Sequence, residues 1–300
     1  MPCRTCGRPR GENIAEGTRC AACGRRQAVV LWLVVAGTAW LLASPGEDGR
    51  LAVLMVALAA TPVAFVTALL LHELTHAAVA TLLGQTVTRV LVGEGVIWWR
   101  LGRDPQLVIG SVPLGNGLTT ILDLRPAGYR RRMCLTLLAA PIASTALACL
   151  ALGIGLMMEP LARVAVLLFG SANAIMAVIT LMPVPTFGGR VWSDLAAALY
   201  LLRADDEALE EHRLLSAQDR MAILVETGAI DLAIATARAA VTASPRAPLA
   251  HSLLAYGLYR AGHVDEAQAV ARRALEHDMA EESRAYLRRF LELEPNVPPK

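Results

Sequence analysis

Two histidines and a glutamate lie within five residues of one another in an apolar stretch of the chain. His72, Glu73 and His76 stand between Ala68-Leu69-Leu70-Leu71 and Ala77-Ala78-Val79-Ala80. On an α-helix, positions i and i+4 share a face, so both imidazoles can bind one metal ion while the glutamate reaches a water beside it. An ionisable side chain inside hydrocarbon costs about 2.5–3.5 kcal/mol or more, so such groups are normally functional there. The pattern predicts a zinc site within a membrane segment.

The third ligand must come from elsewhere, because a catalytic zinc uses three protein ligands and leaves one position open. The carboxylates near the apolar stretches are Glu47, Asp48, Glu94, Asp104, Asp123, Glu159 and Asp194. Asp194 follows a segment whose prolines and glycines would unwind a helix and let the chain turn back. We therefore expect His72, His76 and Asp194 to bind a catalytic zinc, with Glu73 as the general base. In the alternative interpretation, Asp194 is solvated and merely begins the next helix.

A second set of metal ligands lies near the N-terminus. Cys3, Cys6, Cys20 and Cys23 form two C-x-x-C pairs, each followed by glycine, which is the spacing of the two knuckles that enclose a tetrahedral Zn²⁺. We interpret residues 1–27 as a zinc ribbon holding one structural zinc, with no position open for catalysis. A redox pair or disulfides are the alternative, and disulfides are rare in the cytosol.

The composition is that of a membrane protein. Of the 300 residues, 55% are apolar, the mean hydropathy is +0.47, and the charged residues leave long stretches nearly empty. The candidate spans are about 28–43, 51–84, 133–158 and 164–182, and Pro62 is expected to break or kink the second. The net charge of +2 gives no indication of a nucleic-acid partner.

Arginine placement predicts the orientation of these spans. Arginines are concentrated before the first span and between the second and third, whereas the outer turns hold only Arg50 and Arg163. The positive-inside rule then puts both termini in the cytoplasm, with four crossings. We expect a multi-pass integral membrane protein, of a bacterial cell membrane, with its catalytic site near the cytoplasmic face.

Residues 86–124 have a different character. Strand-forming residues alternate there with glycines, including the Gly115-Asn116-Gly117 turn, which predicts short β-hairpins at the membrane surface. We expect the part from 86 to 117 to hold an unwound substrate segment by adding it as a further strand.

The chain after Arg203 reads as a soluble helical domain, residues 204–300. Gly228, Ala233 and Ala240 recur as Gly262, Ala267 and Ala274, an offset of 34 residues that is the tetratricopeptide period. We interpret this region as two such repeats plus a final helix. A generic domain of helical hairpins is the alternative. The expected fold class is mainly α, with 28–203 as the membrane domain.

The order of these motifs resembles a known enzyme family. A His-Glu-x-x-His motif in a membrane helix, followed two spans later by Pro183-Val184-Pro185 and an aspartate, is similar to the site-2 protease family of intramembrane zinc metalloproteases. The similarity covers about residues 51–203. It implies cleavage of membrane-anchored regulatory proteins within or next to the bilayer, and a surface β-segment between the two motif helices.

The second motif departs from the family pattern. Gly188-Gly189 stands where an Asp-Gly usually follows the prolines, and Asp194 comes several residues later. Thr180 stands where an asparagine usually precedes them, and the nearest asparagine is Asn173, about two turns away. Asn173 is either a residue that helps to hold the substrate backbone or a polar group between packed helices.

The expected function is that of a zinc-dependent intramembrane endopeptidase, acting on a membrane-anchored protein, with the ribbon and the repeats binding substrate or a cytosolic partner. The alternative is an inactive relative that serves as a membrane scaffold. The altered second motif favours the scaffold, whereas the intact Glu73 favours the enzyme. A metal transporter would need polar residues along several spans, and here they gather at one point.

Overall fold

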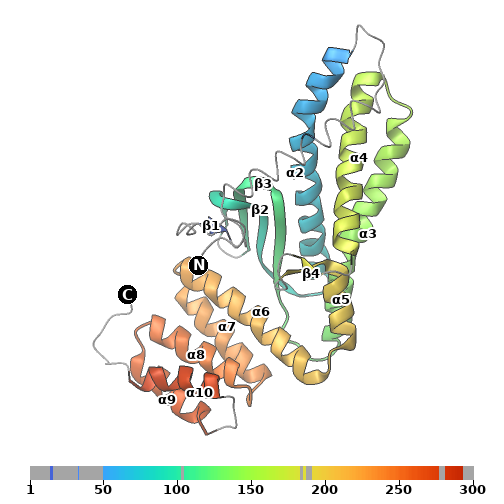
Figure 1. The fold of residues 1–300 in the computed structure, drawn as a ribbon. Coiled ribbons are helices and arrows are strands. Elements are labelled where there is room, and N and C mark those ends of the chain that lie inside the picture. The colour runs from blue at the N-terminus through green and yellow to red at the C-terminus, as the bar shows by residue number, and fades with distance from the viewer. Residues whose placement is uncertain are drawn as a thin grey trace. The chain divides into compact units, whose positions relative to one another are not determined.

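The computed structural model describes residues 14–15, 33, 50–102, 105–182, 185–186, 191–276 and 281–292 (Figure 1). These residues form two compact units. The first runs to Gly84 and continues with Arg89–Thr119 and Arg132–Arg203. The second comprises Gln85–Thr88, Thr120–Arg131 and the residues from Ala204 on.

The first unit contains three long apolar helices, α2 (Arg50–Leu82), α3 (Tyr129–Gly155) and α4 (Pro160–Leu181). Each is long and apolar enough to cross a membrane. They correspond to the second, third and fourth predicted spans, with boundaries shifted by a few residues. The first predicted span, 28–43, and the cysteines of the predicted zinc ribbon lie outside the described residues, so the described part of the chain holds three candidate spans.

The helices are continuous where the sequence has proline. Pro62 lies inside α2 and Pro141 inside α3, and the helical assignment passes through both, so the expected break at Pro62 does not occur. Along α2 and α4, small and branched residues of the two helices form a shared core that includes Ala57, Phe65 and Leu168. This packing supports the helix on both sides of the proline.

The outward faces of these helices are apolar. Large hydrophobic side chains stay exposed along all three helices: Met55, Val63, Leu74, Leu82, Leu135, Ile142, Leu150, Ile154, Val178, Ile179 and Leu181. Leu156 and Met157, in the turn after α3, are exposed as well. Soluble monomers rarely expose apolar surface that is so continuous. A bilayer removes that cost, because lipid tails are as apolar as these side chains.

A small sheet follows α2, as the sequence predicted for 86–124. Strands β2 (Thr86–Leu101) and β3 (Gln106–Leu122) are hydrogen-bonded neighbours, and β1 (Ile14–Ala15) pairs antiparallel with β2, in the order β1-β2-β3. Gly84, with φ 69°, ends α2 and starts the turn into β2, a conformation that favours glycine. The two long strands replace the series of short hairpins that we expected.

A second, two-stranded hairpin follows α4. Strand β4 (Pro185–Thr186) pairs antiparallel with β5 (Val191–Trp192), and helix α5 (Asp194–Arg203) begins directly afterwards. The hairpin reverses the chain at the end of a membrane helix.

The second unit is built mainly from helices α6 (Asp206–Glu226), α7 (Ile230–Ala243), α8 (Pro248–Arg260), α9 (Val264–Ala274) and α10 (Glu281–Leu291). Successive helices pack on each other. Gly228 and Gly262 have φ angles of 75° and 85° in the turns between α6 and α7 and between α8 and α9. Fully buried alanines, among them Ala237 and Ala271, let the helix axes approach closely.

Residues 120–131 pack against this helical unit. Leu122 and Leu124 contact its core, and the Arg213 guanidinium donates to the Leu124 carbonyl oxygen at 3.2 Å. The Tyr129 hydroxyl lies 2.6 Å from His212 Nδ1. These contacts tie the segment before α3 to helix α6.

Candidate metal centre

Helix α2 positions three of the predicted site residues. His72, Glu73 and His76 are only 3%, 5% and 5% exposed, whereas their neighbour Leu74 is 42% exposed. The helical repeat therefore turns the polar face inward and the apolar face outward, as expected for ionisable groups in a membrane helix. The two imidazole rings stand edge to face, with centroids 5.0 Å apart.

The end of α4 and the β4–β5 hairpin bring Asp194 to the same point. The Ser193 hydroxyl donates to the carbonyl oxygen of Met182, the residue that caps α4, so the chain returns to where the helix ended. Ser193 Oγ also accepts from the Ala196 amide at 3.2 Å, which makes it the N-cap of α5. Asp194 is thus the first residue of α5, and this end of the helix lies beside the histidines of α2.

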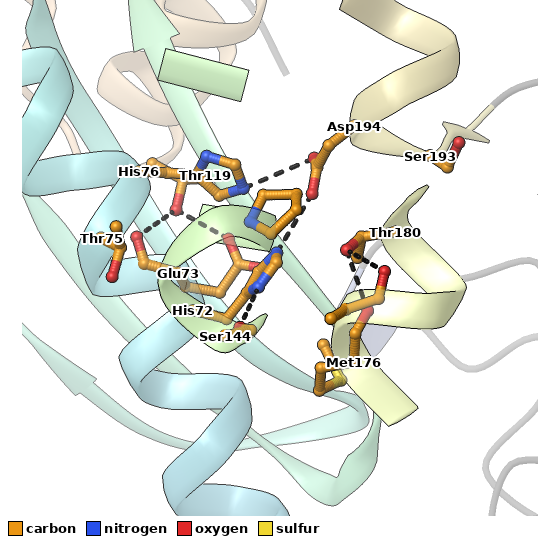
Figure 2. Close-up of polar contacts among 12 residues, drawn as sticks. His72, Glu73, Thr75, His76, Thr119, Ser144, Met176, Thr180, Ser193 and Asp194 are labelled. Atoms are coloured by element: carbon orange, nitrogen blue, oxygen red, sulfur yellow. Dashed lines mark hydrogen bonds and ion pairs between the residues drawn. The ribbon is translucent and has the colours of Figure 1, made fainter. Parts of the chain in front are cut away.

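The carboxylate of Asp194 lies between the two histidines (Figure 2). Its Oδ2 is 3.1 Å from His72 Nε2, and its Oδ1 is 3.4 Å from His76 Nε2. Each residue offers one ligand atom, and these atoms all lie within 4.8 Å of one another. The three residues could therefore hold a metal ion.

The donor set and its spacing fit zinc. Bonds of about 2.0–2.1 Å in a tetrahedral site put neighbouring ligand atoms about 3.3–3.4 Å apart. Each histidine Nε2 has an Asp194 oxygen at a similar distance, 3.1 Å to Oδ2 from His72 and 3.4 Å to Oδ1 from His76. Two imidazole nitrogens and one carboxylate oxygen are also a ligand set of catalytic zinc sites, which keep a fourth position open.

Helix α3 supplies the outer partners of both rings. His72 Nδ1 lies 3.0 Å from Ser144 Oγ, and His76 Nδ1 lies 2.8 Å from the Thr136 carbonyl oxygen. A carbonyl oxygen can only accept, so His76 Nδ1 carries a proton, and Nε2 is the nitrogen that faces the centre and is available to a metal ion. Such contacts orient metal-binding histidines and raise their basicity.

Glu73 is held separately, by strand β3. The Thr119 hydroxyl is 2.7 Å from Glu73 Oε2 and 3.0 Å from the Glu73 carbonyl oxygen. A Cβ at Gly117 would lie 2.2 Å from Glu73 Oε1, so the strand passes close to the carboxylate. Figure 2 shows the Glu73 side chain between Thr119 and the histidine rings.

The surroundings of Asp194 favour the ionised form of its carboxyl. Burial raises the pKa of its carboxyl, but the hydrogen bonds to His72 and His76 and the charge of these rings outweigh burial, so the pKa lies below its usual value. The carboxylate is the form that binds a metal ion.

Two other polar residues considered in the sequence lie apart from this group. Asp123 is fully buried against Arg125, with Nε and Oδ1 2.9 Å apart, and it accepts from Gln85, so its carboxylate is already paired. Asn173, in α4, is completely buried and donates to the Phe169 carbonyl oxygen of its own helix, while its Oδ1 has no protein partner among the described residues. The structure brings neither into the His72–His76–Asp194 group.

Sequence reasoning did not identify Thr119, Ser144 or the Thr136 carbonyl. All three come from elements that follow the motif at a distance, and one threonine or serine in a strand or helix carries no signal of its own. Ser193 could have been identified from the sequence, because serine followed by an acidic residue at the start of an apolar helix is an N-cap pattern.

Comparison of the chain with protein-family models, with curated proteins and with solved structures gives no match. A tetrahedral metal ion held by these three residues would keep a fourth position for water, and the carboxylate of Glu73 on the adjacent helical residue could take a proton from it.

Proposed function

We propose that this protein is a zinc-dependent intramembrane endopeptidase that cleaves membrane-anchored proteins near the cytoplasmic face. The observation that carries the proposal is the convergence of His72, His76 and Asp194 beside a buried Glu73. A merely structural aspartate at the start of α5 has no need to contact two buried histidines that precede it by 122 and 118 residues.

Each residue has a role in the proposed reaction. Bound at the centre, zinc would polarise the scissile carbonyl and acidify the attacking water. The Glu73 carboxylate accepts the proton from that water and passes it to the leaving amine. Ser144 and the Thr136 carbonyl hold the two rings in the orientation that turns each Nε2 inward.

The position of the motif along α2 supports a site near one membrane face. A helix of 33 residues is about 50 Å long, well over the ~30 Å hydrocarbon core, and the motif lies in its final third. The arginine distribution makes that face cytoplasmic, with both termini on the same side.

The surrounding elements suit an extended substrate. A transmembrane helix must unwind before its carbonyls can be attacked, and β3 is an outer strand of the described sheet, to which a peptide could add. We assign the helical unit to substrate or partner binding. The two glycines 34 residues apart, both at positive φ in inter-helix turns, support tetratricopeptide-like repeats.

The test is a cleavage assay in detergent with a model membrane-anchored substrate. Glu73→Gln should abolish cleavage and keep the zinc, because the glutamate is the base and not a ligand. His72→Ala should lose one zinc and all cleavage. Ser216→Ala is the control, since it removes a half-buried hydroxyl that bonds within α6 to the His212 carbonyl oxygen, and it should behave as wild type.

The same assay decides between the enzyme and the scaffold. Equal product from wild type, Glu73→Gln and His72→Ala would end the protease proposal. Bound zinc without cleavage of any membrane-anchored substrate would favour the scaffold.

A further inference from the structure

Strand β3 makes two contacts with the side chain of Glu73. Thr119 and Gly117 are two positions apart, and alternate residues of a strand share a face. Thr119 donates to Oε2, and Gly117 lies over Oε1, Cδ and Cγ of the same side chain. One face of one strand therefore contacts Glu73 at two positions, through the Thr119 hydroxyl and at Gly117. Figure 2 shows the first of these contacts.

The threonine contact gives the carboxylate a direction. A hydroxyl has one proton to donate, and the 2.7 Å distance to Oε2 is shorter than the 3.0 Å distance to the Glu73 carbonyl oxygen. Hydrogen bonds to ionised groups are the stronger kind. Without this donor, the last torsion of a glutamate is broad and only weakly restricted, so the carboxylate would rotate among several positions.

The absence of a side chain at Gly117 leaves the space that the Glu73 side chain occupies. A Cβ at position 117 would lie 2.2 Å from Oε1, 2.7 Å from Cδ and 2.8 Å from Cγ. Distances below about 3 Å are not sustained, so even alanine would push the glutamate side chain off its present path. Gly117 is not one of the described glycines with a positive φ angle. The conformational freedom of a glycine backbone therefore does not explain why a glycine stands here.

From these contacts we infer that β3 positions the general base: Thr119 orients the Glu73 carboxylate, and the absent side chain of Gly117 leaves it room. The inference rests on the proposed function, for which a base must sit within about 3 Å of the proton it takes. Thr119 is a positioning residue, because its hydroxyl bonds to Glu73 and, among the described residues, to neither histidine nor Asp194.

The kinetic test uses Thr119→Val, Thr119→Ser and Gly117→Ala on the full-length protein. Valine keeps the shape and removes the donor, so kcat should fall about 10- to 100-fold, with KM and bound zinc unchanged. Serine restores the donor and should recover most of that loss. Gly117→Ala should lower kcat at least about tenfold, again with zinc retained.

Thr88→Val is the matched control. It removes a threonine hydroxyl from the same sheet, one that donates to the Thr120 carbonyl oxygen at 3.0 Å and makes no contact with Glu73. Its kcat should stay within about twofold of wild type. A Thr119→Val enzyme as active as this control would overturn the inference while leaving the protease proposal intact. A rise in kcat would also overturn it, since β3 would then restrain the base.

A second measurement does not depend on activity. In a double-mutant cycle, the thermal midpoint in detergent is compared for wild type, Thr119→Val, Glu73→Ala and the double variant. If the Thr119 hydroxyl bonds to the Glu73 carboxylate, Thr119→Val should lower the thermal midpoint of the wild-type protein. The same substitution should lower the midpoint of the Glu73→Ala variant much less, because that variant has already lost the carboxylate. Additive changes would overturn the inference. If wild type cleaves nothing, the proposed function fails, and the cycle alone decides whether this contact exists.

Discussion

Removing the Asp194 carboxylate is the sharpest test of the metal centre. The structure brings together three residues that could hold a metal ion, and Asp194 is one of them. Structural zinc sites with four ligands bind with about 10–16 kcal/mol, or about 2.5–4 kcal/mol per ligand. At about 1.4 kcal/mol per factor of ten, Asp194→Ala should weaken zinc binding about 10²- to 10³-fold. The Asp194 side chain is 17% exposed, so a water can enter the vacated position and keep the loss towards the lower end.

The assay is a chelator competition on the purified protein, with zinc counted before and after. Any zinc held by the N-terminal cysteines is common to all variants, so only the difference between variants is read. Asp206→Ala, an exposed carboxylate at the start of α6, is the control and should bind zinc as wild type does. Asp123→Ala should also keep the zinc, although it loses its pair with Arg125 and some stability. If Asp194→Ala binds zinc within about threefold of wild type, or if Asp123→Ala loses the metal, the ligand assignment is wrong.

Four further predictions concern the residues around the centre and the helical unit. Ser144→Ala should weaken zinc binding about 10- to 100-fold, because His72 loses its outer partner; chelator competition measures this. Ser193→Ala should cost about 1 kcal/mol through the lost N-cap of α5, read as a lower thermal midpoint. Gly262→Ala should cost about 1–2 kcal/mol in the same assay, because φ is 85° there and no atom lies near enough to clash. Burial lowers the pKa of His212, so the unfolded chain binds a proton there more readily than the folded one; stability should fall as the pH drops below about 6.5, and His212→Asn should flatten that slope in thermal unfolding between about pH 7.5 and pH 5.5.

The local sequence pattern was sufficient to predict most of the helices and strands themselves. Long apolar runs predicted α2, α3 and α4, because a helix satisfies its own backbone in hydrocarbon. Strand-forming residues predicted the sheet after Thr86, although their glycines suggested several short hairpins where two long strands occur. Of the break or kink expected at Pro62, the break does not occur, and packing between α2 and α4 supports the helix on both sides of the proline.

Which side chains from distant parts of the sequence contact one another could not be predicted from local sequence patterns. The choice of Asp194 over Asp123 was a hypothesis from chain direction, whereas the structure shows Asp123 paired with Arg125 and Asp194 beside both histidines. Thr119 and Ser144 had no sequence signal, because a single hydroxyl becomes a partner only when another element places it there.

The sequence by itself determined that two imidazoles and a carboxylate share one face of an apolar helix, since the helical repeat of 3.6 residues requires it once residues 72, 73 and 76 are chosen. Only the tertiary structure decided what meets that face: Asp194 returning through the β4–β5 hairpin, Ser144 on α3, and Thr119 with Gly117 on β3. The physical reason is the sequence separation over which each effect acts. Helix periodicity acts over a few residues, whereas a ligand set assembled across 122 residues depends on how the helices and strands pack.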